Sequence, residues 1–366
     1  MDWLILFIKV VVVFNIAQGL ATLCVWIERK GSALIQDRIG ANRAGAEFHT
    51  DVLLLKPFLF VVRIAGILGL VNTLLCDAVK ALLKEDFIPE GTSNFVHSLA
   101  PFMGAFPVFL AYALVPIAPE FELFGRVIRP QIASLNVGVL FILAMGSLAV
   151  YGVVIAAWCS NNKFSLLGGL RASAQMISYE LPLGITMVTM ILLYGTADLY
   201  EMVSAQSGLL LGFLPAWGIF YQPLALVLFF VAGMAETKRN PFDLPESESE
   251  LVAGYFTEYS GMKFLLFWLG EFAEIALLSA LMVLMFFGGW HVPYLDLPPT
   301  WWAALVGHGV FMLKVVFFIV LQIVIRWTVP RFRYDQLMTL GWKYMLPLTM
   351  LNLIVTGALV IWSVSY

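Results

Sequence analysis

The sequence is poor in charge and in residues that bind metals. Charged residues make up 12% of its 366 positions and hydrophobic residues 61%, against about 25% and about 45–50% in soluble domains. The three cysteines form no CxxC motif, and the four histidines form no HxxH or HxxxH pair. We therefore expect no iron–sulfur cluster, zinc site or bis-histidine haem within the chain. The cysteines are expected to be small packing residues, and no basic stretch suits nucleic acid.

Most of the chain is apolar enough to lie in lipid. A membrane-spanning helix needs about 20 mostly apolar residues, and eight segments meet this requirement. They predict an all-α polytopic membrane protein with about eight transmembrane helices, which we treat as a single membrane domain over residues 1–366. The amino terminus lacks a basic n-region and a small-residue cleavage site, so the first span is expected to be kept. The predicted spans are residues 3–26, 98–119, 136–159, 174–195, 219–237, 263–288, 303–325 and 345–364.

Lysine and arginine are unevenly distributed between the predicted loops. Of the 21 in the chain, 17 fall in four loops on one side of the membrane. By the positive-inside rule these loops face the cytoplasm. The chain is then expected in a bacterial cytoplasmic (inner) membrane, with both termini in the periplasm. The four loops are residues 27–97, 160–173, 238–263 and 326–344.

Two segments within the loop at 27–97 are expected to lie on the membrane surface. Residues 52–76 are apolar enough to span, but they contain Lys56 and Arg63, and a crossing here would invert the charge bias. A tilted or re-entrant position at the cytoplasmic interface fits them better. Residues 76–89 carry apolar positions at helical spacing with charges on the other face, which predicts an amphipathic surface helix.

Several charged residues fall in or at the ends of predicted spans, where a charge costs a few kcal/mol or more. Glu180 lies well inside the fourth span, Glu236 closes the fifth, and Lys314 lies near the middle of the seventh. Glu271 and Glu274 are three residues apart in the sixth, so they share a helix face. One explanation is interhelical ion pairing, for instance of Glu271 with Lys314. The other is a proton path, because four carboxylates exceed what one lysine can neutralise.

The loop at 238–262 concentrates carboxylates. Glu246, Glu248 and Glu250 alternate with serines, and their mutual repulsion should raise their proton affinity. An isolated ESESE would be read as an ordinary solvated loop. The apolar and aromatic frame around it favours a loop that packs against something. The frame consists of Phe242, Leu244, Leu251, Val252, Tyr255, Phe256 and Tyr259.

A second polar cluster, WIERKGSALIQDRIGANRAG at 26–45, follows the first span. Alone, it would be read as a basic anchor on the cytoplasmic side. Together with the acidic loop, it could build a polar vestibule at the membrane face.

Four motifs resemble the family of H subunits, which are membrane subunits of proton-translocating NADH–quinone oxidoreductase, respiratory complex I. The resemblance covers about 26–45 and 76–364, nearly the whole chain. The motifs are ERKGSALIQDRIGANR (28–43), SNNKFSLLGGLRASAQMISYE (160–180), ETKRNPFDLPESESELVAGYFTEYSGMKF (236–264) and PRFRYDQLMTLGWKYMLPLT (330–349).

This resemblance implies a subunit that joins the membrane arm of the complex to its peripheral arm. Its cytoplasmic loops would form part of a chamber for quinone, such as ubiquinone, and a row of carboxylates would lead from the chamber toward antiporter-like subunits. The chain would bind no cofactor of its own. Quinone would be its substrate, and the iron–sulfur clusters, the flavin and the NADH site would belong to partner subunits. Peripheral quinone-module subunits, neighbouring membrane subunits and lipid would be its partners.

The resemblance also assigns roles to residues of this sequence. Those expected at the quinone chamber are Glu28, Arg29, Arg38, Arg43, Asp243, Tyr255 and Tyr259. Those expected on the proton or coupling path are Asp77, Glu180, Glu236, Glu246, Glu248, Glu250, Glu271 and Lys314.

Three features depart from the family pattern. Ala41 stands where the family has a proline, about 20 extra residues precede KEDFIP (84–89), and Glu274 is an addition. Two other readings stay open. The corresponding subunit of a membrane-bound hydrogenase would look similar, and an independent proton-coupled transporter would transport as a purified single chain.

Overall fold

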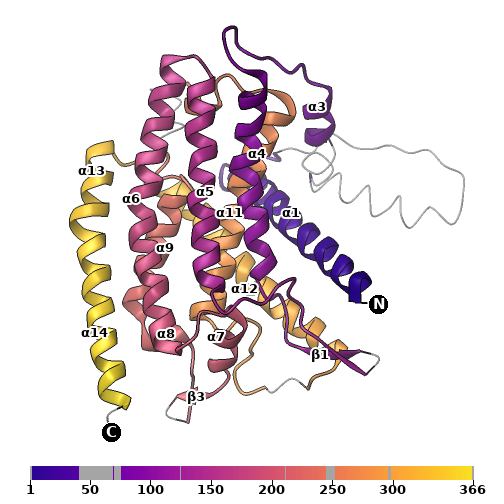
Figure 1. The fold of residues 1–366 in the computed structure, drawn as a ribbon, viewed down its shortest axis with the longest axis vertical. Coiled ribbons are helices and arrows are strands. Elements are labelled where there is room, and N and C mark those ends of the chain that lie inside the picture. The colour runs from indigo at the N-terminus through magenta and orange to yellow at the C-terminus, as the bar shows by residue number, and fades with distance from the viewer. Residues whose placement is uncertain are drawn as a thin grey trace, which may run out of the picture.

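The computed structural model describes residues 2–40, 69, 76–123, 125–210, 212–244, 252–295 and 298–364. In this part of the chain, long helices run side by side as an up-and-down bundle, and strands occur only as two short hairpins (Figure 1). The prediction of an all-α polytopic membrane protein is confirmed.

Seven of the described helices are long and apolar enough to cross a membrane. An eighth, α9 (Pro223–Glu236), is apolar but has 14 residues, fewer than the roughly 20 that a span normally needs. The seven are α1 (Asp2–Ile35), α4 (Asn94–Ala111), α5 (Gly138–Cys159), α6 (Lys163–Tyr194), α11 (Gly261–Phe286), α12 (Trp301–Thr328), and the unit of α13 (Tyr334–Thr339), a π-helical turn (Leu340–Met345) and α14 (Leu346–Val364).

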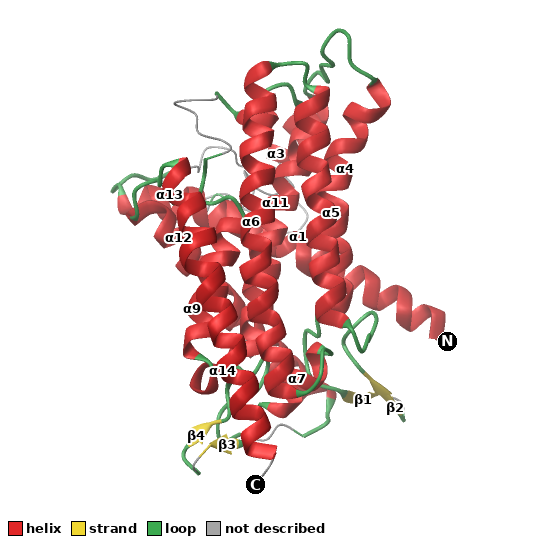
Figure 2. Ribbon diagram, turned by 60° about the vertical axis from the view of Figure 1, so that its left-hand side comes forward, coloured by secondary structure: helices red, strands yellow, loops and turns green. Residues whose placement is uncertain are grey.

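Shorter elements connect these helices. The described connections include a surface helix, short helical turns and two antiparallel hairpins, β1–β2 and β3–β4 (Figure 2). Their bounds are α3 (Asp77–Leu83), η3 (Tyr112–Leu114), β1 (Phe121–Leu123), β2 (Arg126–Ile128), α7 (Leu199–Ala205), β3 (Leu209–Leu210), β4 (Leu214–Pro215), α8 (Gly218–Tyr221) and η4 (Gly254–Phe256).

The two ends of the bundle differ in character. We call the end that carries residues 160–163, 237–260 and 329–333 the loop end, and the end that carries the two strand hairpins the hairpin end. In Figure 1 the loop end is at the top and the hairpin end at the bottom. Five of the lysines and arginines predicted to face the cytoplasm belong to these loop-end segments, namely Lys163, Lys238, Arg239, Arg331 and Arg333.

Several helices begin or end away from their predicted limits. α4 ends at Ala111 and its 3-10 continuation at Leu114, short of the predicted end at residue 119. α1 continues to Ile35, past the predicted end at residue 26, so Glu28 and Arg29 lie on a helix. α6 begins at Lys163 inside a stretch that was predicted to be a loop, because the Asn162 side chain caps it by accepting a hydrogen bond from the Phe164 N–H at 3.0 Å. Charged residues at the membrane surface are compatible with a helix that extends beyond the lipid. The stretch at 52–76 lies outside the described residues except for Gly69 and Cys76.

α11 is the central helix of the bundle. In its most apolar window 89% of the residues are buried, against 22% for α1 and 17% for the α13–α14 unit. The outer helices expose apolar side chains, as expected for surfaces that face lipid or partner subunits. Glu271 and Glu274 of α11 are therefore buried inside the protein.

Small residues let neighbouring helices approach closely. A Cβ on Gly152 of α5 would lie 2.4 Å from the backbone nitrogen of Gly104 in α4. One on Gly169 of α6 would lie 2.1 Å from the Cβ of Ala157 in α5. The bundle at the loop end therefore depends on the absence of these side chains.

We expect Gly169→Ala to destabilise the protein by about 1–3 kcal/mol, because the added methyl group must push α5 and α6 apart. Gly184→Ala in the same helix is the matched control. Its Cβ would meet Leu143 at an ordinary 3.7 Å, and replacing a helical glycine can add up to about 1 kcal/mol of stability. Thermal unfolding of the purified protein in detergent measures both, and equal midpoints for the two variants would contradict the close approach.

Candidate functional site

Three buried side chains form a group in the half of α11 nearer the loop end. Lys238 Nζ lies 2.9 Å from Glu271 Oε1 and donates to the Tyr255 hydroxyl at 2.9 Å. The Tyr255 hydroxyl in turn donates to Glu271 Oε1 at 2.5 Å. The side chains of Lys238 and Glu271 are only 4% and 7% exposed. We call this group the ionic triad.

A bend in the chain after α9 brings Lys238 into the bundle. α9 ends at Glu236, and Lys238 follows with a φ of 53°, in the left-handed region that few residues other than glycine adopt. Gln175 of α6 holds the bend from both sides, because its side-chain amide donates to the carbonyls of Ala235 and Phe242 at 2.8 Å each. The bend is thus fixed to the bundle and aims a lysine inward.

Arginines surround two further carboxylates beside the triad. Glu28 of α1 receives Arg326 of α12 in a short contact and lies 3.6 Å from Arg239. The guanidinium of Arg239 also lies over the ring of Phe272, 4.2 Å from its centroid. We call Glu28, Asp243, Arg239, Arg326 and Arg331 the arginine network.

The proton affinity of Asp243 is set by opposing influences. Arg331 donates to its Oδ2 at 3.0 Å. Burial raises the pKa of Asp243, and the charges of Arg331, Arg326 and Arg239 act in the opposite direction. A change in charge nearby would therefore alter the proton affinity of this carboxylate.

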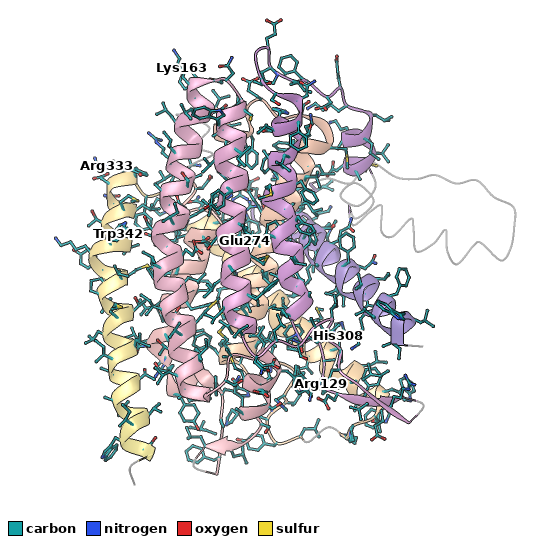
Figure 3. All side chains as sticks on the ribbon, in the orientation of Figure 1. Arg129, Lys163, Glu274, His308, Arg333 and Trp342 are labelled. Carbon is teal, nitrogen blue, oxygen red and sulfur yellow. The ribbon has the colours of Figure 1, made fainter. Side chains whose placement is uncertain are left out.

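Three more carboxylates line one small cavity between the helices. Glu180 of α6, Glu236 at the end of α9 and Glu274 of α11 face a space of about 40 Å³ whose other described walls are apolar. Ser147 of α5 donates a short hydrogen bond to Glu180, and Glu236 Oε2 is buried with no hydrogen-bond partner among the described residues. Figure 3 labels Glu274 in the middle of the bundle. We call this space the acidic cavity.

The triad and the acidic cavity are adjacent. Glu271 and Glu274 lie three residues apart on one face of α11, about 4.5 Å along the helix axis. On the other side, Glu236 and Lys238 are separated by one residue at the bend. A cavity of about 40 Å³ exceeds what one water molecule requires, and carboxylates supply the polar partners that a buried water needs. The arrangement can therefore carry a proton between carboxylates through a short polar route.

The ionic triad identifies the ion partner of Glu271. This carboxylate is ion-paired, as the structural explanation expected, but its partner is Lys238 rather than Lys314. Lys314 lies toward the hairpin end, where Nζ donates to the carbonyls of Phe287, Gly289 and His291 at 2.8–2.9 Å. The structure therefore does not place Lys314 with the carboxylates that were predicted to share a path with it.

The remaining described candidates occupy the edge of the site. Arg29 of α1 pairs with Asp77 of α3 at 2.5 Å, which fastens the surface helix to the bundle. Tyr259 stacks on the ring of His97 with centroids 4.2 Å apart, and burial raises the pKa of its hydroxyl. Arg38 is exposed and donates to Gln36 at 2.7 Å.

Some candidates fall outside the described residues, namely Arg43, Glu246, Glu248 and Glu250. The segments on either side of the three glutamates do pack as their aromatic frame predicted. Five members of that frame are buried and Val252 is exposed. The buried members are Phe242, Leu244, Tyr255, Phe256 and Tyr259.

The lysine and arginine residues of the site were not predicted from the sequence. Lys238, Arg239, Arg326 and Arg331 counted only as positive-inside charges, although each contacts a carboxylate. A lysine and an arginine directly after a span that ends in glutamate were the available signal. Glu274 stands out in the sequence but is absent from the predicted path, and the structure places it with Glu180 and Glu236.

Comparisons with known proteins agree with this architecture. The profile of a family described as NADH dehydrogenase matches residues 8–357. The chain is 44% identical to the NADH-quinone oxidoreductase H subunit of Bdellovibrio bacteriovorus, over 96% of this chain and 94% of that protein. It is 44% identical to H subunit 1 of the same enzyme from Geobacter metallireducens, over 95% and 94%. It is 48% identical to the H subunit from Protochlamydia amoebophila, over 77% and 82%.

A match of this length and identity is decisive for the family. It covers the helices that supply the triad, the arginine network and the acidic cavity. The chain belongs to the NADH dehydrogenase family, among the H subunits of the membrane part of NADH–quinone oxidoreductase, respiratory complex I.

Proposed function

We propose that this chain forms part of the quinone chamber of the complex and couples quinone reduction to proton translocation. The observation that carries the proposal is the set of buried and part-buried charged groups that extends from the arginine network, through the ionic triad, to the acidic cavity. Keeping charges in such an interior is costly unless they are paired or can take up protons. In a purely structural role, every buried charged group would be expected to have a partner. Glu236 instead has an oxygen without a partner among the described residues.

The chamber would lie at the loop end, beside the arginine network. Its walls would include the residues that the family motifs assign to it, of which Glu28, Arg29 and Asp243 belong to or border the described network. Iron–sulfur clusters and flavin of partner subunits would supply the electrons. The quinone would be held and desolvated by this chain's residues, and its reduction would change the charge next to Asp243 and Glu28.

The coupling step would use the triad as a switch. A new negative charge at the chamber competes with Glu271 for the ammonium of Lys238. Once that pair weakens, Glu271 gains proton affinity and can bind a proton relayed by Tyr255, whose hydroxyl passes its proton to Glu271 at 2.5 Å and regains one from Lys238 through their hydrogen bond. Glu274, one turn deeper, and Glu236 and Glu180 across the cavity then extend the proton route toward neighbouring membrane subunits. Glu246, Glu248 and Glu250 would feed this route from the loop.

The basic loop end would face the cytoplasm of a bacterium. The charge bias supports this orientation, and it puts the chamber on the side where NADH is oxidised. Both termini would then be periplasmic, and the other subunits of the complex would cover parts of the exposed helix faces.

Lys238→Met should impair assembly, because it leaves the buried charge of Glu271 without its ion partner, which costs about 3–5 kcal/mol. The double variant Lys238→Met with Glu271→Gln removes both charges and should recover assembly. If the triad couples quinone reduction to proton movement, the double variant should still reduce quinone about tenfold more slowly than the unmodified complex. The measurement is NADH:quinone activity per assembled complex. Full recovery of activity in the double variant would show that the pair is only structural.

Glu180→Gln should lower both quinone reduction and proton pumping in the assembled complex, because the amide cannot bind and release the proton that the route requires. Ser147→Ala is the matched control, since it removes the hydrogen bond to Glu180 and leaves the carboxylate in place. Activity and pumping in inverted vesicles are the measurements. A Glu180→Gln defect confined to the amount of complex would support ion pairing or packing instead.

Sidedness is tested by cysteine labelling in intact cells and in inverted vesicles. A cysteine at Ser247 in the acidic loop should react only in inverted vesicles, because that loop is expected in the cytoplasm. One at the exposed Ser207 near β3 should react in intact cells. The reverse pattern would overturn the orientation.

A further inference from the structure

A groove on the outside of the bundle lies between α1 and α12 at the hairpin end. Its volume is about 620 Å³, within the range of about 300–1,000 Å³ that small-molecule sites occupy. Apolar side chains of both helices and of the segment around β1 form its walls. Lys9 and His308 are the only titratable groups among the described residues that line it. His308, labelled in Figure 3, lies on this side of the molecule.

A second hollow continues the first and adds charge. It measures about 590 Å³ and lies between the start of α1 and strand β2. The two hollows share Ile5, Lys9 and Ile128, so they form one surface that passes from an apolar groove to a basic rim. Arg126 stands on the far wall of this rim.

Lys9 is the feature that requires an explanation. It is half-buried on a helix that spans the membrane, and no described residue gives it a hydrogen bond or an ion pair. His308 is engaged otherwise, because its Nδ1 lies 3.0 Å from the carbonyl oxygen of Ile117. A lysine ammonium in this position is costly unless it reaches water or an anion.

Tryptophans mark the depth of the groove in the membrane. Trp3, Trp301 and Trp302 are 84%, 57% and 50% exposed, as is typical of the layer of lipid headgroups. Lys9 lies six residues beyond Trp3, about 9 Å along α1. A lysine stem can extend over most of that distance toward the headgroups, which brings its ammonium nearer to lipid phosphates.

From these observations we propose that the groove and its basic rim bind one anionic phospholipid. An acyl chain occupies the apolar groove between α1 and α12, and the phosphate group lies between Lys9 and Arg126. The apolar part alone would not select an occupant, because lipid tails are as apolar as the groove. Selection comes from charge, which favours an anionic headgroup over a zwitterionic one and over a neutral quinone.

The test uses the assembled complex in lipid nanodiscs with two photoreactive lipids, phosphatidylglycerol and phosphatidylcholine, each carrying the reactive group in an acyl chain. Labelled peptides are quantified by mass spectrometry. We expect phosphatidylglycerol to label the peptides of α1 and α12, which form the groove for the acyl chain, more than phosphatidylcholine does. Lys9→Met should reduce the labelling by phosphatidylglycerol about fivefold. Adding Arg126→Gln to Lys9→Met should reduce the labelling further, because each cation near the headgroups contributes a similar amount to the binding of an anionic lipid.

Two variants separate charge from general damage. Lys9→Arg keeps the charge and should retain the labelling. Lys343→Met removes an exposed lysine from the π-helical turn before α14, far from the groove, and should change nothing. Equal labelling by both lipids in the unmodified complex would overturn the proposal. So would the absence of labelling by either lipid, because a protein segment would then cover the groove.

Discussion

In the low-dielectric interior of this bundle, a buried charge must be neutralised by an opposite charge or a proton, or stabilised by hydrogen bonds. Most of what is distinctive in the structure follows from this constraint. Lys238 and Glu271 are buried because each neutralises the other and Tyr255 completes their hydrogen bonds. The same requirement explains why Glu28 and Asp243 are surrounded by arginines drawn from separate segments of the chain.

The carboxylates of the acidic cavity satisfy the constraint differently. No described cation contacts Glu236 or Glu274 directly, and the cavity leaves room for water. The ionic triad holds paired charges, and the adjacent acidic cavity holds carboxylates that can bind protons. A change in charge at the triad can therefore cause a proton to move in the cavity. The central position of α11, which carries Glu271 and Glu274 one turn apart, links the two parts mechanically as well as electrostatically.

Sequence reasoning recovered the helices and the acidic residues because both depend on short-range composition. Apolar run length located the seven long helices and the shorter α9, and charges inside those runs identified Glu180, Glu236 and Glu271. Pairing was harder, because it depends on how distant segments meet. The Lys238–Glu271 contact requires a left-handed residue at the end of α9, and no local pattern indicates which cation will turn inward. The partners of Lys314 are backbone carbonyls, which the sequence does not reveal.

The central claim is that carboxylates of this chain change protonation when quinone is reduced beside them. Infrared difference spectroscopy of the assembled complex, with quinone reduction started by NADH, reports the carbonyl stretch of protonated carboxyl groups. We predict a carboxyl signal that follows turnover and loses a component when Glu274 is replaced by glutamine. A spectrum in which these carboxylates stay ionised throughout turnover, identical with and without Glu274, would contradict the account.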